Sequence, residues 1–144
     1  MALALYGPGF DWAHNDMHQD ETRITDKFFT DNEAGKKGET VKLVNGRWTK
    51  ASGTDVPGGI LDADVVAGVD QVCDVTLIRP GDVFKVKYTG TPAGGFTEGA
   101  NAVAIAADGL SVNAATVAGG AVAIRDIDTT NQMCTVYFKL RQFS

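Results

Sequence analysis

The stretch Val72-Cys-Asp-Val-Thr-Leu-Ile-Arg-Pro-Gly-Asp-Val-Phe-Lys-Val-Lys-Tyr88 decides the fold class, because it holds two strand patterns separated by a turn. Over residues 72–78 the alternation places Cys73, Val75 and Leu77 on one face of a strand. Residues 79–82 have proline and glycine at the two positions where a type II turn requires them. Residues 83–88 are rich in β-branched and aromatic side chains, so we expect a return strand.

Similar turn signals occur on both sides of this stretch. Asn-Gly at 45–46 separates two β-prone runs, residues 40–44 and 47–50, and Asp-Gly at 108–109 separates residues 102–107 from 110–112. Both dipeptides are typical of two-residue hairpins, because their residues tolerate positive φ. The last predicted strand covers residues 132–140, with Cys134, Val136 and Phe138 facing inward. This spacing predicts an all-β domain over residues 39–144, with a barrel or a sandwich as its architecture.

Residues 1–38 lack such a pattern, and we interpret them as an extended N-terminal arm. The arm is acidic and holds five of the twelve aromatic residues of the chain. Large rings on a segment that cannot pack them usually need another surface to cover them. We therefore predict that the partner-binding residues are Tyr6, Phe10, Trp12, Phe28 and Phe29. For the pair Phe28 and Phe29 a second interpretation stays open, in which they cap the end of the barrel.

The overall composition favours a single domain with an appendage. The chain has 144 residues and a net charge of −5, which weighs against binding to nucleic acid. No apolar run approaches the ~20 residues that a membrane helix needs. The N-terminus lacks the basic region of a secretory signal, so we expect a cytosol-like compartment. The two cysteines, Cys73 and Cys134, are too few for a disulfide framework, and we expect both to be reduced and buried.

Candidate catalytic and metal-binding patterns are weak throughout. His14 and His18 could share a helical face, but no glutamate follows the first histidine and no third ligand is evident, so we expect no metal and no cofactor. Residues 35–40 fail the spacing of a phosphate-binding loop. The carboxylates of residues 62–74 lack EF-hand spacing. Because no Ser-His-Asp arrangement stands out either, the sequence predicts a protein that is not an enzyme.

The order of motifs resembles that of the small capsid decoration (cement) proteins of tailed bacteriophages. The motifs that carry the resemblance are Gly38-Glu-Thr-Val41, the Asn45-Gly46 hairpin, Ala51-Ser-Gly-Thr54, Pro57-Gly-Gly-Ile60, Arg79-Pro-Gly-Asp-Val83, Ala114-Ala115 and Gly119-Gly-Ala-Val-Ala-Ile-Arg125. They cover about two-thirds of the chain. The longer and more acidic arm departs from the family pattern.

The resemblance implies a small β-barrel or β-tulip-like domain with an extended N-terminal arm. It also implies a structural virion protein that binds the outside of the head and stabilises contacts between major capsid subunits. It also implies a homotrimer, located on the capsid surface and in the host cytoplasm during assembly. Two alternatives stay open. One is another phage component, such as a tail tube, fibre base or head–tail joining protein. The other is a small β-barrel module that binds a ligand, for which the sequence shows no convergent polar groups.

Overall fold

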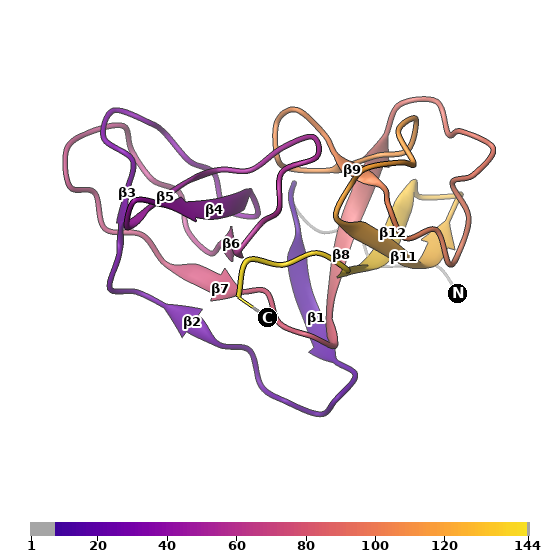
Figure 1. The fold of residues 1–144 in the computed structure, drawn as a ribbon, viewed down its shortest axis with the longest axis horizontal. Coiled ribbons are helices and arrows are strands. Elements are labelled where there is room, and N and C mark those ends of the chain that lie inside the picture. Colours follow the sequence, from indigo (N-terminus) through magenta and orange to yellow (C-terminus); the bar gives the residue numbers. More distant parts are fainter. Residues whose placement is uncertain (1–7, 144) are drawn as a thin grey trace.

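Figure 1 shows the computed structural model, which describes residues 8–143 as two β-sheets lying side by side. Within this range every regular element is a strand, and the predicted all-β class is confirmed. Each sheet has six strands. No helix in the described range is long and apolar enough to cross a membrane.

The first sheet is built around β8, the longest strand, in the order β11-β12-β8-β10-β9, and β1 also pairs with β8. β8 is antiparallel to β12 and β1 and parallel to β10. The strands of this sheet are β1 (Asp11–Asn15), β8 (Asp82–Thr89), β9 (Ala104–Ile105), β10 (Val112–Asn113), β11 (Val122–Asp128) and β12 (Met133–Phe138).

The second sheet has the order β2-β7-β6-β4-β5-β3. Its neighbours are antiparallel except β3 and β5, which run parallel. The strands of this sheet are β2 (Arg23–Ile24), β3 (Phe28–Phe29), β4 (Thr40–Val44), β5 (Arg47–Lys50), β6 (Gly59–Leu61) and β7 (Val75–Leu77). β1 stands between the two sheets in Figure 1, with the second sheet on the side away from β8.

The two hairpin turns predicted from Asn-Gly and Asp-Gly are confirmed. Asn45 and Gly46 have φ of 50° and 81°, which are the two positive values that a type I′ turn requires. They join β4 to β5 in an antiparallel pair. Asp108-Gly109 lies in the connection between β9 and β10, which are also antiparallel. The second connection is longer than a two-residue turn, since it covers residues 106–111, and only Gly109 of the dipeptide has positive φ.

The strand predicted after the Arg79 turn is present as β8, but its expected return onto the preceding strand is wrong, because β7 and β8 belong to different sheets. The turn itself forms as expected, with Gly81 at φ 83° and the Asp82 amide donating to the Arg79 carbonyl. However, β7 pairs with β6 and β2, whereas β8 pairs with β1, β10 and β12. The turn therefore carries the chain from the second sheet into the first.

The buried carboxylate of Asp82 explains why β8 pairs with β1. Asp82 is 1% exposed, and its side chain accepts hydrogen bonds from Trp12 Nε1 at 3.0 Å and Asn15 Nδ2 at 2.9 Å. It also accepts one from the Arg79 amide at 2.9 Å and lies 3.1 Å from the Arg79 guanidinium. These contacts fasten the start of β8 to β1. We call this group of four residues the Asp82 clamp.

The molecule has two hydrophobic cores, each built mainly from one sheet, and Ile60 of β6 in the second sheet joins the first core. The first core gathers side chains of β8, β11 and β12 together with Phe10, whose ring lies 5.4 Å from that of Phe138. The second core is smaller and includes Phe29, Trp48, Leu61 and Val75. Because burial of apolar surface is the main favourable term in folding, each sheet is stabilised mainly by the core on its inner face.

Residues 8–38, which we expected to form an extended arm, are instead part of both sheets. β1 pairs with β8, while β2 and β3 are edge strands of the second sheet. The backbones also touch: the Phe10 amide donates to the Gly38 carbonyl at 2.8 Å, and a Cβ on Gly9 would lie 2.6 Å from Gly38 Cα. This segment is covered by residues distant in sequence, which is why it showed no periodicity of its own.

At the other end of the chain, residues 139–143 cross from the first sheet to the second, and we call them the strap. The Gln142 side chain accepts from the Leu43 amide at 2.7 Å and donates to the Leu43 carbonyl at 3.0 Å. The side-chain amide of Gln142 therefore makes the pair of hydrogen bonds that a neighbouring strand would make with Leu43. The Phe143 ring then packs edge-on against Trp48, with 6.2 Å between the ring centroids, and helps to cover the second core.

Both cysteines are free and buried, as predicted, but they lie in different cores. Burial raises the pKa of Cys134 to about 12, and burial together with Asp74 raises that of Cys73 to about 11. Because the thiolate is the reactive form, we expect both native thiols to react slowly with a thiol reagent at pH 7 and rapidly in denaturant. Changing either to serine should cost roughly 1–3 kcal/mol. Rapid labelling of the native protein would contradict this.

Candidate functional site

The structure places the residues predicted to bind a partner in different environments. Phe10 is 3% exposed and Phe29 is fully buried, so the chain's own cores cover both rings. Trp12 packs against the first core and is held by the Asp82 clamp. Tyr6 lies outside the described residues. Among the members of this set that the structure describes, only Phe28 is exposed to a large extent, with 42% of the residue accessible to solvent.

Phe28 belongs to a row of side chains on the outer face of the second sheet. Phe28 and Arg47 are register partners between β3 and β5, and Arg47 and Val44 are partners between β5 and β4. On its other side Phe28 forms a bridge with Val72. Register partners point to the same face of a sheet, so these four side chains lie next to one another. We call Val44, Arg47, Phe28 and Val72 the outer row.

The outer row is apolar and exposed, apart from the guanidinium at its centre. Val44 is 45% exposed and Val72 is 67% exposed. Arg47 Cζ lies 5.4 Å from the centre of the Phe28 ring, which is a cation–π distance. Apolar side chains grouped in this way on a surface are typical of interaction sites, whereas isolated ones need no explanation.

Carboxylates hold Arg47 in place and make the row acidic. Arg47 forms ion pairs with Asp31 at 3.0 Å and Asp70 at 2.6 Å. The Asp70 hydrogen bond is the main reason that the pKa of Arg47 lies above its usual value. Asp31 also accepts from the Asp70 amide at 3.0 Å, so the chain on either side of the row is tied together. Glu33 adds a further carboxylate beside Thr49, which shares the outer face.

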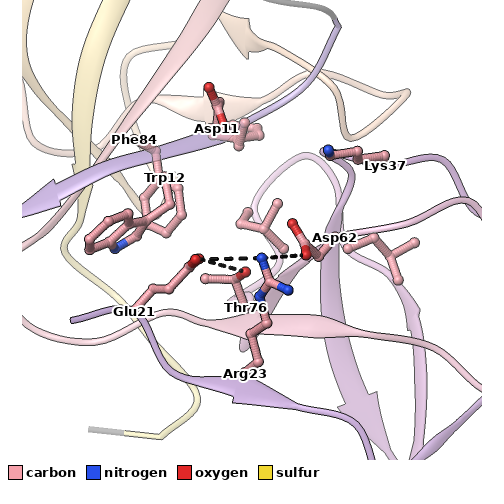
Figure 2. A pocket seen from close by; sticks show the side chains of 11 residues that line it. Asp11, Trp12, Glu21, Arg23, Lys37, Asp62, Thr76 and Phe84 are labelled. Atoms are coloured by element: carbon pink, nitrogen blue, oxygen red, sulfur yellow. Dashed lines mark hydrogen bonds and ion pairs between the residues drawn. The ribbon is translucent and has the colours of Figure 1, made fainter.

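A polar pocket of about 210 Å³ lies between the sheets and is shown in Figure 2. At its base Arg23 pairs with Asp62 at 2.9 Å and approaches Glu21 at 3.5 Å. Thr76 on β7 also contacts Glu21. These four side chains pair with one another at the base of the pocket, whereas Asp11 and Lys37 line it without an ion pair to this group.

A buried carboxylate, Glu39, lies where β4 begins. The residue is 3% exposed, and Lys50 Nζ approaches one of its oxygens at 3.4 Å. Its other oxygen, Oε2, has no hydrogen-bond partner among the described residues. Burial raises the pKa of Glu39 above its usual value, and Lys50 only partly opposes this effect. The charged form of Glu39 is therefore a cost to the folded state.

This cost predicts a pH effect that Glu39→Gln should remove. A folded pKa above the unfolded value means that the native state binds the proton more tightly, so the penalty is present at neutral pH and disappears as the pH falls towards the ordinary value of 4.5. We expect the stability of the wild type relative to the variant to rise over that interval. Thermal unfolding of both proteins at several pH values measures it, and parallel curves would contradict the expectation.

The two histidines predicted to have no metal-binding role are on an exposed segment. His14 Nε2 lies 2.8 Å from Asp16 Oδ1, and the other Asp16 oxygen contacts Tyr137 and Arg125. The hydrogen bond from Tyr137 is the main reason that the pKa of Asp16 is lowered. Across residues 8–143 no three His, Cys, Asp or Glu side chains are grouped so that they could hold a metal ion.

The sequence reasoning missed Arg47, Val44 and Val72 as members of a surface. Val44 and Arg47 flank the Asn-Gly turn, so their shared face followed from the hairpin register once that turn was recognised. The partnership of Phe28 with Arg47 and Val72 is different, since it joins segments far apart in the chain. No local pattern around residues 65–74 indicated it.

Neither the models of known protein families nor the curated proteins contain a match to this chain.

Proposed function

We propose that this chain is a structural virion protein that binds the outside of a bacteriophage head and stabilises contacts between major capsid subunits. The motif order over residues 38–125 supports this, because it resembles that of capsid decoration proteins. The all-β body agrees with the same class. In this proposal the protein acts on the capsid surface as a homotrimer, is present in the host cytoplasm during assembly, and has neither a catalytic role nor a cofactor.

The observation that carries the proposal is the outer row. The chain covers Phe10, Phe29 and Trp48 with its own cores, yet leaves Phe28 exposed in a row that also holds the exposed Val44 and Val72. A protein whose role is attachment needs such a surface, because aromatic and apolar side chains at the centre of an interface contribute most of its binding energy. Tyr6, Phe10, Trp12 and Phe29 then contribute through the fold or lie outside the described residues, and Phe28 remains the proposed contact residue.

Co-sedimentation with capsid shells assembled without this protein tests the proposal. We expect saturable binding to intact shells and increased resistance of the shells to heat or chelators. Binding to unassembled capsid subunits should be much weaker, since the proposed site bridges neighbours. If no protein sediments with the shells at any concentration up to about 100-fold above a micromolar Kd, the proposal fails.

A further inference from the structure

We infer that the polar pocket between the sheets binds a small organic zwitterion, an amino acid whose cationic group meets Glu21 and whose carboxylate meets Lys37. The inference goes beyond the proposed function and does not depend on it, because no residue that lines the pocket belongs to the outer row. The pocket lies beside β1, β2, β6 and β7, whereas the outer row lies mainly on β3, β4 and β5.

The size of the pocket suits a molecule as small as an amino acid. Its volume of about 210 Å³ is below the roughly 300–1,000 Å³ of pockets that hold drug-sized ligands. A second cavity of about 480 Å³ adjoins it, and Phe10, Asp11 and Lys37 line both. Lys37 therefore lies where the two cavities meet.

The base of the pocket carries a net negative charge, which selects a cationic group. Glu21 and Asp62 share a single guanidinium, that of Arg23. The contacts of Glu21 with Arg23 and Thr76 are both 3.5 Å long, at the outer limit of a hydrogen bond, so its carboxylate can accept a better placed donor. In Figure 2 this carboxylate lies between the Trp12 ring and the Arg23 guanidinium. A carboxylate next to an aromatic ring is a suitable site for an organic cation.

Lys37 supplies the opposite charge on another side of the pocket. Among the described residues its ammonium group has no hydrogen-bond or ion-pair partner. Its backbone is fixed, because the Lys37 amide donates to Asp64 Oδ1 at 2.8 Å and the Gly38 amide donates to the Leu61 carbonyl at 2.7 Å. The turn thus places the lysine at the pocket before a ligand binds, which lowers the entropic cost of binding.

The charge balance favours a zwitterion over a simple ion. Three carboxylates and two cationic side chains line the pocket, and the second cavity adds one of each, Asp64 and Lys36. An inorganic anion would therefore enter a cleft whose net charge is −1. Within residues 8–143 no three carboxylate, histidine or cysteine side chains are grouped to hold a metal ion. A molecule with both charges pairs with Lys37 and Glu21 at the same time.

Calorimetric titration of the purified protein with ω-amino acids tests the site. Glycine, β-alanine, 4-aminobutyrate, 5-aminovalerate and 6-aminohexanoate place the ammonium and carboxylate groups at increasing separations. We expect at least one of them to bind at one site per chain with a Kd of about 1 mM or below. The matched amine and carboxylate, such as pentylamine and pentanoate for 5-aminovalerate, should bind about tenfold more weakly or worse, since each lacks one charge-assisted contact.

Two variants assign the two ends of the ligand. Lys37→Gln should remove the preference for the zwitterion over the amine, and Glu21→Gln should remove the preference for the zwitterion over the carboxylate. Asp26→Asn and Lys87→Gln are the matched controls, because both residues are exposed and line neither cavity, and they should bind like the wild type. Each variant must keep the melting transition of the wild type, so that lost binding is not lost folding.

Three results would overturn the inference: no binding by any member of the series up to about 10 mM, an amine or carboxylate that binds as tightly as the zwitterion, or full binding by both Lys37→Gln and Glu21→Gln. Capsid shells take no part in these titrations. A protein that sediments with shells but binds no zwitterion would retain the proposed function without this site, and one that binds the zwitterion but no shells would show the reverse.

Discussion

Replacing Asp82 with alanine should lower the free energy of unfolding by about 3–5 kcal/mol, because it leaves buried polar groups without their partner. Trp12, Asn15 and Arg79 all direct donors at this carboxylate. The variant should also loosen β1, since two of these donors belong to that strand. Urea unfolding measures the loss, and hydrogen exchange of the β1 amides measures the loosening. Asp26→Ala, at an exposed carboxylate, should change stability by less than about 0.5 kcal/mol.

The same clamp predicts how acid affects the protein. Burial alone would raise the pKa of Asp82, but hydrogen bonds from Arg79, Trp12 and Asn15 outweigh it and the pKa lies below its usual value. A lowered folded pKa means that the contribution is present above the unfolded value of 3.8 and is lost as pH falls through the folded value. Below that point the stability difference between wild type and Asp82→Ala should shrink. A constant difference across this range would show that the carboxylate charge is not what the clamp uses.

Phe10→Ala should destabilise the protein as much as Asp82→Ala does. We expect the free energy of unfolding to fall by about 3–5 kcal/mol, which is the usual cost of removing a buried phenylalanine. Its ring is 3% exposed and packs on Phe138 of β12. Phe28→Ala, on the exposed outer row, should cost less than about 1 kcal/mol, chiefly from the lost contact with Arg47. Chemical denaturation of the two variants makes the comparison. Equal and small effects would mean that residues 8–15 behave as the separate arm that the sequence suggested.

Local chemistry predicted the turns of this fold but not the partners of its strands. The Asn45-Gly46 hairpin followed from two residues that accept positive φ. The turn at Arg79 was also correct, but the strand after it joined the other sheet, because Asp82 found donors in Trp12 and Asn15, near the start of the chain. Such a choice depends on residues about half the chain away, and a short window cannot reveal it.

The same limit applied to the candidate site. Val65 and Val66 are neighbours in sequence, yet one is 5% exposed and the other 76% exposed. A pair of valines in an irregular connection carries no alternation that would separate them. Phe28 and Phe29 were predicted together as anchors, and only the strand geometry of β3 sends their rings to opposite faces. Aromatic composition therefore drew attention to the segment that contains Phe28 without identifying which of its rings is exposed.

The way the two ends of the chain cross between the sheets has a consequence for folding kinetics. β1 precedes all strands of the second sheet but is inserted beside β8, and the strap, which follows β12, completes the core around Trp48. During synthesis, all strands of the second sheet would leave the ribosome before β8. The core around Trp48 would stay partly uncovered until the strap is synthesised. Long loops must close before either core is finished, which slows folding. Refolding should accordingly be a single slow phase in which both sheets form together, and a nascent chain halted near residue 100 should remain a substrate for chaperones.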